Sequence, residues 1–426
     1  MLLQGGRVVD PSQGVDTVAD LLIQDGLIAD LGQNLSGPDG VEAIDVRGKV
    51  VAPGLIDVHV HFREPGRVEA ETVATGSRAA AAGGFTSVCA MPNTDPVTDN
   101  QAAIGFAVKQ ANAATGARVL PYGALSVGQR GEQLAEFSNL IDAGAVALSD
   151  DGHPVVSSHF MRTALEYART FNVPVADHCE EPALATGGAM HEGVVSTRLG
   201  LKGIPSAAEE IMVARDVILS DLTGGHVHLC HMSTRGCVDI IRRAKDNGVN
   251  VTAEVTPHHL ALTHEECEGY YTNAKMNPPL REAADVEALR EGLRDGTIDM
   301  IATDHAPHHY EAKEQDFDEA PFGIIGLETA LGLCYKELVQ SGILSLPELI
   351  QRMSTNPARA YRIDGGTLAK GSVADVVVFD PGATWIVEPE RFLSKSRNTP
   401  FGGQELVGRV ERTVVGGRTV FELGTS

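Results

Sequence analysis

The chain has 426 residues, of which 43% are hydrophobic and 21% are charged, and its formal net charge at pH 7 is −23. This length predicts one large domain with a smaller one beside it. The charge argues against a nucleic-acid partner because Lys and Arg are not clustered, and no stretch approaches the ~20 consecutive apolar residues of a membrane span. The first residues carry no signal-peptide pattern, so we expect a soluble, cytoplasmic protein.

The cysteines are consistent with the same compartment. They occur without CxxC pairs, and several lie in apolar strand patterns, as buried free thiols do. We therefore expect reduced thiols in a reducing cytoplasm at Cys89, Cys179, Cys230, Cys237, Cys267 and Cys334.

Both ends of the chain predict strands. Residues 1–52 contain short apolar strands separated by Gly and Asp-Gly turns, and residues 367–426 contain further strands without a helical pattern. Because chain ends often lie close together in a domain, we expect both ends to pair into one small β-domain that flanks the middle of the chain.

The middle, residues 53–366, repeats a short apolar strand, a polar or Gly-rich loop and a segment of helical period. The predicted strands are LIDVHVHF, FTSVCAMPN, RVLPYGALS, AVALSDDG, VPVADHCE, HVHLCHMS, NVTAEVTPHH and DMIATDHAPHH. This alternation predicts an α/β fold, a TIM-like (β/α)₈ barrel. An open doubly wound sheet is the alternative, and the strand count and the absence of GxGxxG after the first strand disfavour it.

The first of these strands ends in Asp57-Val-His59-Val-His61. Alternation along a strand puts His59 and His61 on one face, and neutral imidazoles are favoured ligands of zinc-like ions. An isolated HxH is more often a pair of polar residues at a strand end. The other strand ends decide between the two interpretations.

Reactive groups of such barrels gather at the C-terminal ends of the strands. Here strand four ends with Asp150-Asp151, strand five with His178, strand six with His231 and strand eight with Asp304. Each alone is more often a cap or a buried structural residue. Together, four imidazoles and two carboxylates exceed the needs of one tetrahedral ion, so we predict two ions, taken as zinc, bridged by a carboxylate and a hydroxide. Asp304 is the predicted catalytic acid/base.

At these residues the chain resembles a known family. The run GLIDVHVHFREPG, the strand ends around Asp151, His178 and His231, the MPNT motif and the eighth-strand ATDHAPHH resemble the amidohydrolase superfamily and, within it, the dihydroorotases of the bacterial, type I kind. The resemblance covers essentially the whole chain, and HFREPG and MPNT are its specific part. It implies reversible, metal-dependent interconversion of dihydroorotate and N-carbamoyl-L-aspartate in de novo pyrimidine biosynthesis, and a β-domain built from both chain ends.

The resemblance also implies roles for the strand-end residues. One ion would be held by His59 and His61, the other by His178 and His231, with Asp304 completing the first site and Asp151 bridging. Many relatives bridge with a carboxylated lysine, but the fourth strand, GAVALSDDG, contains no lysine. The predicted metal ligands are His59, His61, Asp151, His178, His231 and Asp304.

A ring that bears a carboxylate needs a fixed cation, and Arg63 offers a planar guanidinium two residues past His61. The resemblance implies further substrate contacts, so that the predicted set is His61, Arg63, Asn93, Asn277, His308, Phe322 and Gly323. For His258, His259 and His309 a structural role is slightly favoured. The charged segment 307–326 predicts a lid, with a surface excursion as the alternative.

Two other functions remain open at this point. Another cyclic-amide hydrolase, an allantoinase or hydantoinase, would share the metal chemistry, although Arg63 argues for a substrate with a carboxylate. A scaffold partner of aspartate transcarbamoylase would belong to a different class, but all six ligand positions are filled here. We expect a small-molecule substrate and a homodimer; association with aspartate transcarbamoylase, the number and identity of the ions and the need for a partner stay open.

Overall fold

A computed structural model describes residues 1–38 and 40–424. Its centre is a barrel of short parallel strands, each paired with the next along the chain. A bridge between Val60 and His305 joins the last strand segment to the first and closes the barrel. The strands are β6 (Leu55–Val60), β7 (Phe85–Ala90), β8 (Arg118–Pro121) continued by β9 (Gly123–Ala124), β10 (Leu148–Ser149), β11 (Val175–Asp177), β14 (Val227–Leu229), β15 (Val251–Val255) and β16 (Met300–Ile301). The predicted (β/α)₈ barrel is confirmed.

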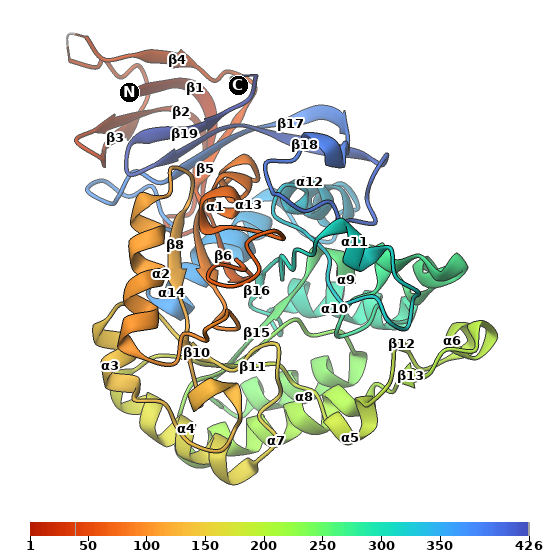
Figure 1. The fold of residues 1–426 in the computed structure, drawn as a ribbon. Helices are drawn as coiled ribbons and strands as arrows, with labels where there is room; N and C mark the ends of the chain where they lie inside the picture. The colour runs from red at the N-terminus through yellow and green to blue at the C-terminus, as the bar shows by residue number, and fades with distance from the viewer. Residues whose placement is uncertain (39, 425–426) are drawn as a thin grey trace.

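Helices surround the barrel, as Figure 1 shows for α2, α3, α4, α7 and α8. The predicted helical segments form α1 (Val73–Ala82), α2 (Gln101–Ala113), α4 (Ser158–Phe171), α7 (Ala207–Thr223), α8 (Arg235–Asp246) and α10 (Ala283–Asp295), and α3 (Phe137–Asp142) lies between α2 and α4. The side chains of Thr72, Ser157 and Thr234 cap the first turns of α1, α4 and α8. Helices α7 and α10 end at Gly224 and Gly296 in the left-handed conformation that favours glycine.

The barrel interior is filled by buried side chains from several strands and strand ends, among them Ile56, Val58, Cys89, Ala176 and Cys230. A second apolar layer lies between the strands and the outer helices. All six cysteines are free and buried, as the sequence predicted.

Both chain ends contribute to one eight-stranded sheet, which carries both termini at the top of Figure 1. Its strands are β1 (Leu2–Asp10), β2 (Val15–Gln24), β3 (Leu27–Gly32), β4 (Ala43–Asp45), β5 (Val50–Pro53), β17 (Val376–Ile386), β18 (Glu405–Val415) and β19 (Arg418–Glu422). The antiparallel pairing of β5 with β17 joins the N-terminal and C-terminal strands. The flanking β-domain is thus confirmed, while its division from the barrel at 52/53 and 366/367 stays a prediction.

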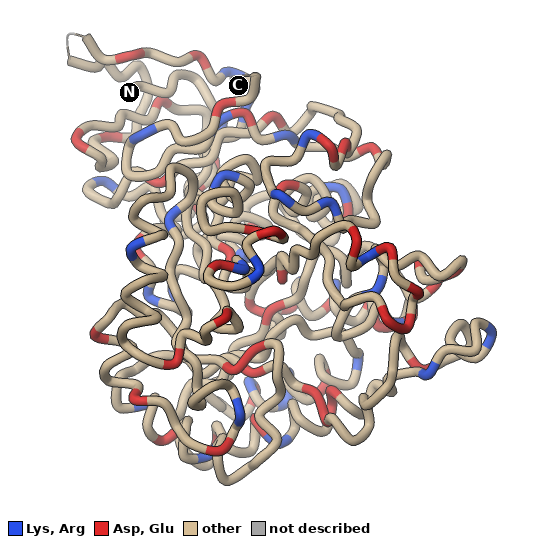
Figure 2. Tube along the Cα trace, viewed as in Figure 1, with Lys and Arg blue, Asp and Glu red and all other residues tan. Residues whose placement is uncertain are grey.

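Several elements lie outside the repeating pattern. An arm at the right of Figure 1 is formed by β12 (Met190–His191), α6 (Val194–Leu199) and β13 (Gly203–Ile204), preceded by α5 (Pro182–Ala185). The remaining short elements are η1 (Val127–Gln129), α9 (Pro257–Ala261), η2 (His264–Tyr270), η3 (Thr272–Ala274), α11 (Tyr310–Lys313), α12 (Ala330–Cys334), η4 (Tyr335–Gln340), α13 (Leu346–Ile350), η5 (Gln351–Thr355), α14 (Asn356–Tyr361) and η6 (Pro389–Arg391). None of the helices in the described residues is long and apolar enough to span a membrane. Figure 2 shows acidic and basic residues interspersed over both the barrel and the β-domain.

Candidate active site

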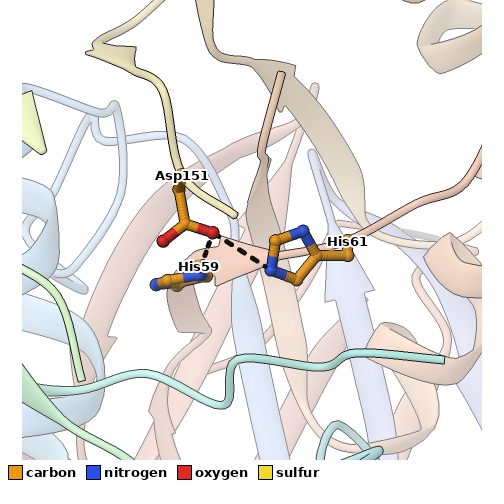
Figure 3. A group of neighbouring side chains, drawn as sticks. All are labelled: His59, His61 and Asp151. Atoms are coloured by element: carbon orange, nitrogen blue, oxygen red, sulfur yellow. Dashed lines mark ion pairs between the residues drawn. The ribbon is translucent and has the colours of Figure 1, made fainter. Parts of the chain in front are cut away.

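Asp151 lies between two pairs of histidines at the C-terminal mouth of the barrel. Its Oδ2 is 3.3 Å from His59 Nε2 and 3.4 Å from His61 Nε2, as the dashed lines in Figure 3 mark. Its other oxygen, Oδ1, is 3.5 Å from His231 Nε2 and 3.7 Å from His178 Nδ1. One carboxylate thus presents a separate oxygen to each histidine pair, which is the arrangement that a bridging ligand requires.

Asp304 faces the first of these pairs from the end of the eighth strand. Its Oδ1 is 3.0 Å from His61 Nε2 and 3.5 Å from His59 Nε2. Asp304 and His231 both have positive φ, +46° and +40°. A residue other than glycine in this conformation costs about 1–3 kcal/mol, and such strain concentrates at functional sites. The backbone therefore bends at two strand ends to turn these side chains into the mouth.

The donor set suits a metal centre. His59 Nε2, Asp151 Oδ1 and Asp304 Oδ1 are buried and have no hydrogen-bond partner in the described part of the chain. Burial opposes the charged form of Asp304, but the imidazoles of His59 and His61 hold its pKa well below its usual value. Buried polar atoms without partners are rare, and an ion or a water molecule usually satisfies them. Imidazole nitrogens and carboxylate oxygens that lie within 4.8 Å of one another could hold such an ion.

A buried carboxylate that the sequence analysis did not single out supports His59. Glu254 Oε1 is 2.6 Å from His59 Nδ1, and Glu254 Oε2 is 3.0 Å from His228 Nε2. Burial would raise the pKa of Glu254, but the neighbouring imidazoles lower it to about 2, so it accepts both hydrogen bonds as a carboxylate. His59 then carries its proton on Nδ1, which leaves the Nε2 lone pair for a metal ion.

A second buried carboxylate, Asp57, holds the backbone beside the site. It is fully buried and accepts hydrogen bonds from the backbone N–H of His59 and from the N–H and hydroxyl of Thr303. Since Thr303 precedes Asp304, these bonds join the first strand to the eighth at the site. Burial raises the pKa of Asp57 to about 7.

Asn93, predicted as a substrate contact, also orients a histidine. Its Oδ1 accepts a hydrogen bond from His61 Nδ1 at 2.9 Å. This bond leaves His61 Nε2 free to face Asp151 and Asp304. A Cβ on the neighbouring Gly152, which has φ +88°, would lie 2.7 Å from Asn93 Nδ2. Glycine at this position therefore lets the amide approach the site.

A cavity of about 640 Å³ opens over the cluster. Its lining includes every predicted substrate contact, namely His61, Arg63, Asn93, Asn277, His308, Phe322 and Gly323. Of the predicted metal ligands, Asp151, His178, His231 and Asp304 also line it, whereas His59 does not. A further cavity of about 790 Å³, between α12 and β18, contains none of these residues.

Arg63 brings a positive charge to this cavity. Its side chain is only 6% exposed, and its one hydrogen bond in the described residues runs from Nε to the Pro307 carbonyl, 3.2 Å away. Burial lowers its pKa to about 9. The guanidinium therefore remains charged at neutral pH, and its two terminal amino groups are left for an anion in the cavity.

The other cavity-lining residues are held in place by the protein. Asn277 Nδ2 donates to Glu180 Oε2 at 2.8 Å, and Asn277 Oδ1 is buried without a partner in the described chain. His308 Nε2 lies 2.7 Å from the Phe322 carbonyl. Burial, aided by Arg63, lowers the pKa of His308 to about 2, so its imidazole is neutral and donates this bond.

The three histidines left open by the sequence differ from one another. His259 bonds Thr256 Oγ1 at 2.7 Å and the Pro278 carbonyl at 3.0 Å, which is a structural role. The side chain of His309 is 39% exposed and lies beside Glu311. His258 is buried, and its Nε2 has no partner among the residues described.

The comparisons with known proteins agree with this geometry. Residues 48–237 match a family model described as dihydro-orotase-like, and residues 247–421 match one described as amidohydrolase family. A dihydroorotase of Anaeromyxobacter sp. (strain K) is 54% identical over 426 residues, with 100% of this chain and 98% of the relative covered. A dihydroorotase of Geobacter metallireducens is 52% identical over 422 residues, 99% of each chain.

The chain belongs to the dihydroorotase family. Its fold is shared more widely. The L-hydantoinase (dihydropyrimidinase) of Arthrobacter aurescens superposes with a TM-score of 0.90 at 27% identity, covering 100% of this chain and 96% of the other. The dihydropyrimidinase of Brevibacillus agri gives a TM-score of 0.85 at 25% identity, covering 99% and 95%.

Proposed function

We propose that this chain is a metal-dependent dihydroorotase that interconverts dihydroorotate and N-carbamoyl-L-aspartate in de novo pyrimidine biosynthesis. The observation that carries the proposal is the buried guanidinium of Arg63, which has no carboxylate partner among the described residues and lines the same cavity as the carboxylate and imidazole cluster. Dihydroorotate presents both matching groups, a carboxylate and a cyclic amide. The relatives named dihydroorotase, with 52% and 54% identity over the whole chain, support the same substrate.

We assign two zinc ions to the site. His59, His61 and Asp304 would hold one, His178 and His231 the other, and Asp151 would bridge them. The separate oxygens that Asp151 presents to the two histidine pairs support this division. When bound, the ions would supply an activated water and polarise the ring carbonyl.

Asp304 is the proposed acid/base. Its lowered pKa makes it a carboxylate at neutral pH, ready to accept a proton when water attacks the amide. The same carboxyl group would return that proton to the ring nitrogen as the C–N bond breaks. In the biosynthetic direction the steps reverse, and Asp304 takes the proton from the carbamoyl nitrogen.

The remaining cavity residues would orient the ring. Arg63 would bind its carboxylate through the two terminal amino groups. Asn277 would use its partnerless Oδ1 as an acceptor, and Asn93 and His308 would contact the ring from the sides. The backbone N–H of Phe322 would complete the contacts, since the Gly323 N–H already donates to the Lys275 carbonyl.

Hydrolysis rates of dihydroorotate, hydantoin and allantoin by the purified, zinc-loaded chain would test the proposal. The Arg63 guanidinium predicts a strong preference for dihydroorotate, because the other two rings lack a carboxylate. Turnover of hydantoin or allantoin without turnover of dihydroorotate would assign another cyclic-amide hydrolase. A loaded chain inactive on all three would favour a scaffold role or an absent partner.

We further propose a homodimer in the cytoplasm, with association with aspartate transcarbamoylase as a separate possibility to test. Six free, buried thiols support a reducing compartment. Ile211, Ile218 and Leu222 on α7 are 51–65% exposed, and an interface between copies would cover apolar surface of this kind. Sedimentation of the chain alone and with aspartate transcarbamoylase would decide both points.

A further inference from the structure

Two buried lysines meet beside the cavity, and neither belongs to the predicted metal ligands. Lys275 is 3% exposed and Lys313 is 5% exposed, although lysine is almost never buried unless its ammonium group is paired. Neither ammonium group forms an ion pair among the described residues, and both donate to backbone carbonyls instead. We call Lys275 and Lys313 the lysine pair.

Lys313 holds the backbone that lines the cavity. Its Nζ donates to the carbonyls of Pro321 at 2.8 Å, Gly323 at 3.2 Å and Lys275 at 3.4 Å. The Gly323 N–H in turn donates to the Lys275 carbonyl at 3.0 Å. The two chain segments are therefore joined both directly and through one ammonium group.

The backbone at Gly323, which takes part in these hydrogen bonds, is closely surrounded by other atoms. Its φ is +152°, and a Cβ there would lie 2.7 Å from the Ala306 carbonyl oxygen and 2.7 Å from His308 Cδ2. Asn398 Nδ2 bonds both the Gly323 and the Ala306 carbonyls at 3.0 Å. The carbonyl of Gly323 thus accepts from two buried side chains, and its position is determined from two sides.

Lys275 makes the reciprocal connection. Its Nζ donates to the carbonyls of Phe317 at 2.6 Å and Asp318 at 3.0 Å, and it lies 4.7 Å from the centre of the Phe322 ring. Lys275 stands two residues before Asn277, so the same segment carries the lysine and a proposed substrate contact. Each lysine therefore reaches from one substrate-contacting segment to the other.

We propose that Lys313 is a positioning residue which, together with Lys275, fixes the Phe322–Gly323 backbone against the Asn277 segment, so that residues 307–326 form a rigid wall of the cavity and not a lid. The kinetic consequence rests on the proposed function, whereas the structural consequence does not. Two further buried side chains of the segment, Phe317 and Ala320, fit a wall, because a segment that opens needs few buried contacts.

Hydrogen exchange measured by mass spectrometry on the whole chain tests the structural part. In the unaltered protein, a peptide covering residues 316–326 is expected to exchange as slowly as peptides from the barrel strands. In Lys313→Met, which keeps the length and removes the donors, its exchange should rise about tenfold or more. Fast exchange in the unaltered protein, or no change in the variant, would overturn the proposal. The measurement on the unaltered protein remains decisive even if the variant fails to fold.

Steady-state kinetics test the positioning role. Since the fixed backbone would contact the ring equally in the ground state and the transition state, Lys313→Met should raise the KM for dihydroorotate about fivefold or more with kcat within about threefold. Any other pattern would overturn the role. Glu314→Gln, which changes the exposed neighbour, is the matched control and should leave both constants unchanged. An unaltered chain that does not turn over dihydroorotate would refute the proposed function instead, and the exchange data would still decide whether the wall is rigid.

Discussion

Replacing Glu254 by glutamine would remove a single charge beside the proposed metal site while keeping the shape of the side chain. The carboxylate accepts from His59 Nδ1 at 2.6 Å, from His228 Nε2 at 3.0 Å and from the His231 backbone N–H at 3.2 Å. An amide can accept on one side only and must present its NH₂ group on the other. It therefore weakens the support of His59 in either orientation.

The size of the effect follows from the orientation that the amide adopts. With its oxygen towards His59, the Nε2 lone pair stays available, but the partner loses its charge. With its NH₂ group towards His59, the imidazole must carry its proton on Nε2 and can no longer bind an ion there. Loss of such a supporting partner lowers metal affinity about 10–100-fold, or about 1.4–2.7 kcal/mol.

Competition with a chromophoric chelator at pH 7.5 would measure the affinity of each ion in the unaltered chain and in Glu254→Gln. Glu265→Gln is the matched control, because that carboxylate is 57% exposed. Thermal unfolding in excess chelator would separate a folding defect from a binding defect. Zinc affinity within about twofold of the unaltered chain would refute the assignment of His59 as a ligand supported by Glu254.

Three further substitutions probe separate parts of the account. In zinc-loaded Asp304→Asn, kcat for dihydroorotate hydrolysis should fall about 10²–10⁴-fold. A smaller loss would show that Asp304 is not the acid/base. Arg63→Ala should raise the KM for dihydroorotate about 100-fold, as expected when a charged hydrogen-bond partner is lost; an unchanged KM would place the substrate carboxylate elsewhere. Burial, aided by Lys275 and opposed by Cys267, lowers the pKa of Lys313 to about 7 from its ordinary 10.5. Between these two pH values the unfolded chain binds more protons than the folded chain, so the free energy of unfolding rises with pH. Urea unfolding should show the unaltered chain gaining about 2 kcal/mol relative to Lys313→Met from pH 7 to pH 9, and a constant difference would contradict the lowered pKa of Lys313 in the folded chain.

The residues at the strand ends could be predicted to lie together because the repeating strand–helix pattern shows where each barrel strand ends. Parallel strands of a barrel deliver their last residues to one mouth, so His59, His178, His231 and Asp304 could be brought together from their places in the sequence pattern. The helices between the strands could be predicted equally well, since each buries one face and its apolar residues therefore recur at the helical period.

The supporting residues were hidden for a physical reason. Glu254 is a single carboxylate inside an apolar strand, and its burial is explained by contacts with His59, 195 positions away, and with His228 and His231 on the neighbouring strand and its end. A buried carboxylate in such a strand is the one signal that could have found it. Asn398 and Lys313 give no signal at all in the sequence, because their partners are backbone groups that almost any residue type supplies.

Removal and return of the metal is the most direct test of the central claim that the six predicted ligands form a catalytic metal centre. The chain should lose dihydroorotate hydrolysis when its metal is removed by a chelator and regain it as zinc is added, with activity levelling off at about two ions per chain. His59→Ala and His178→Ala should each lower the number of ions bound. Full activity in the metal-free chain would contradict this claim. So would two bound ions in both His59→Ala and His178→Ala, even if zinc restored activity to the unaltered chain.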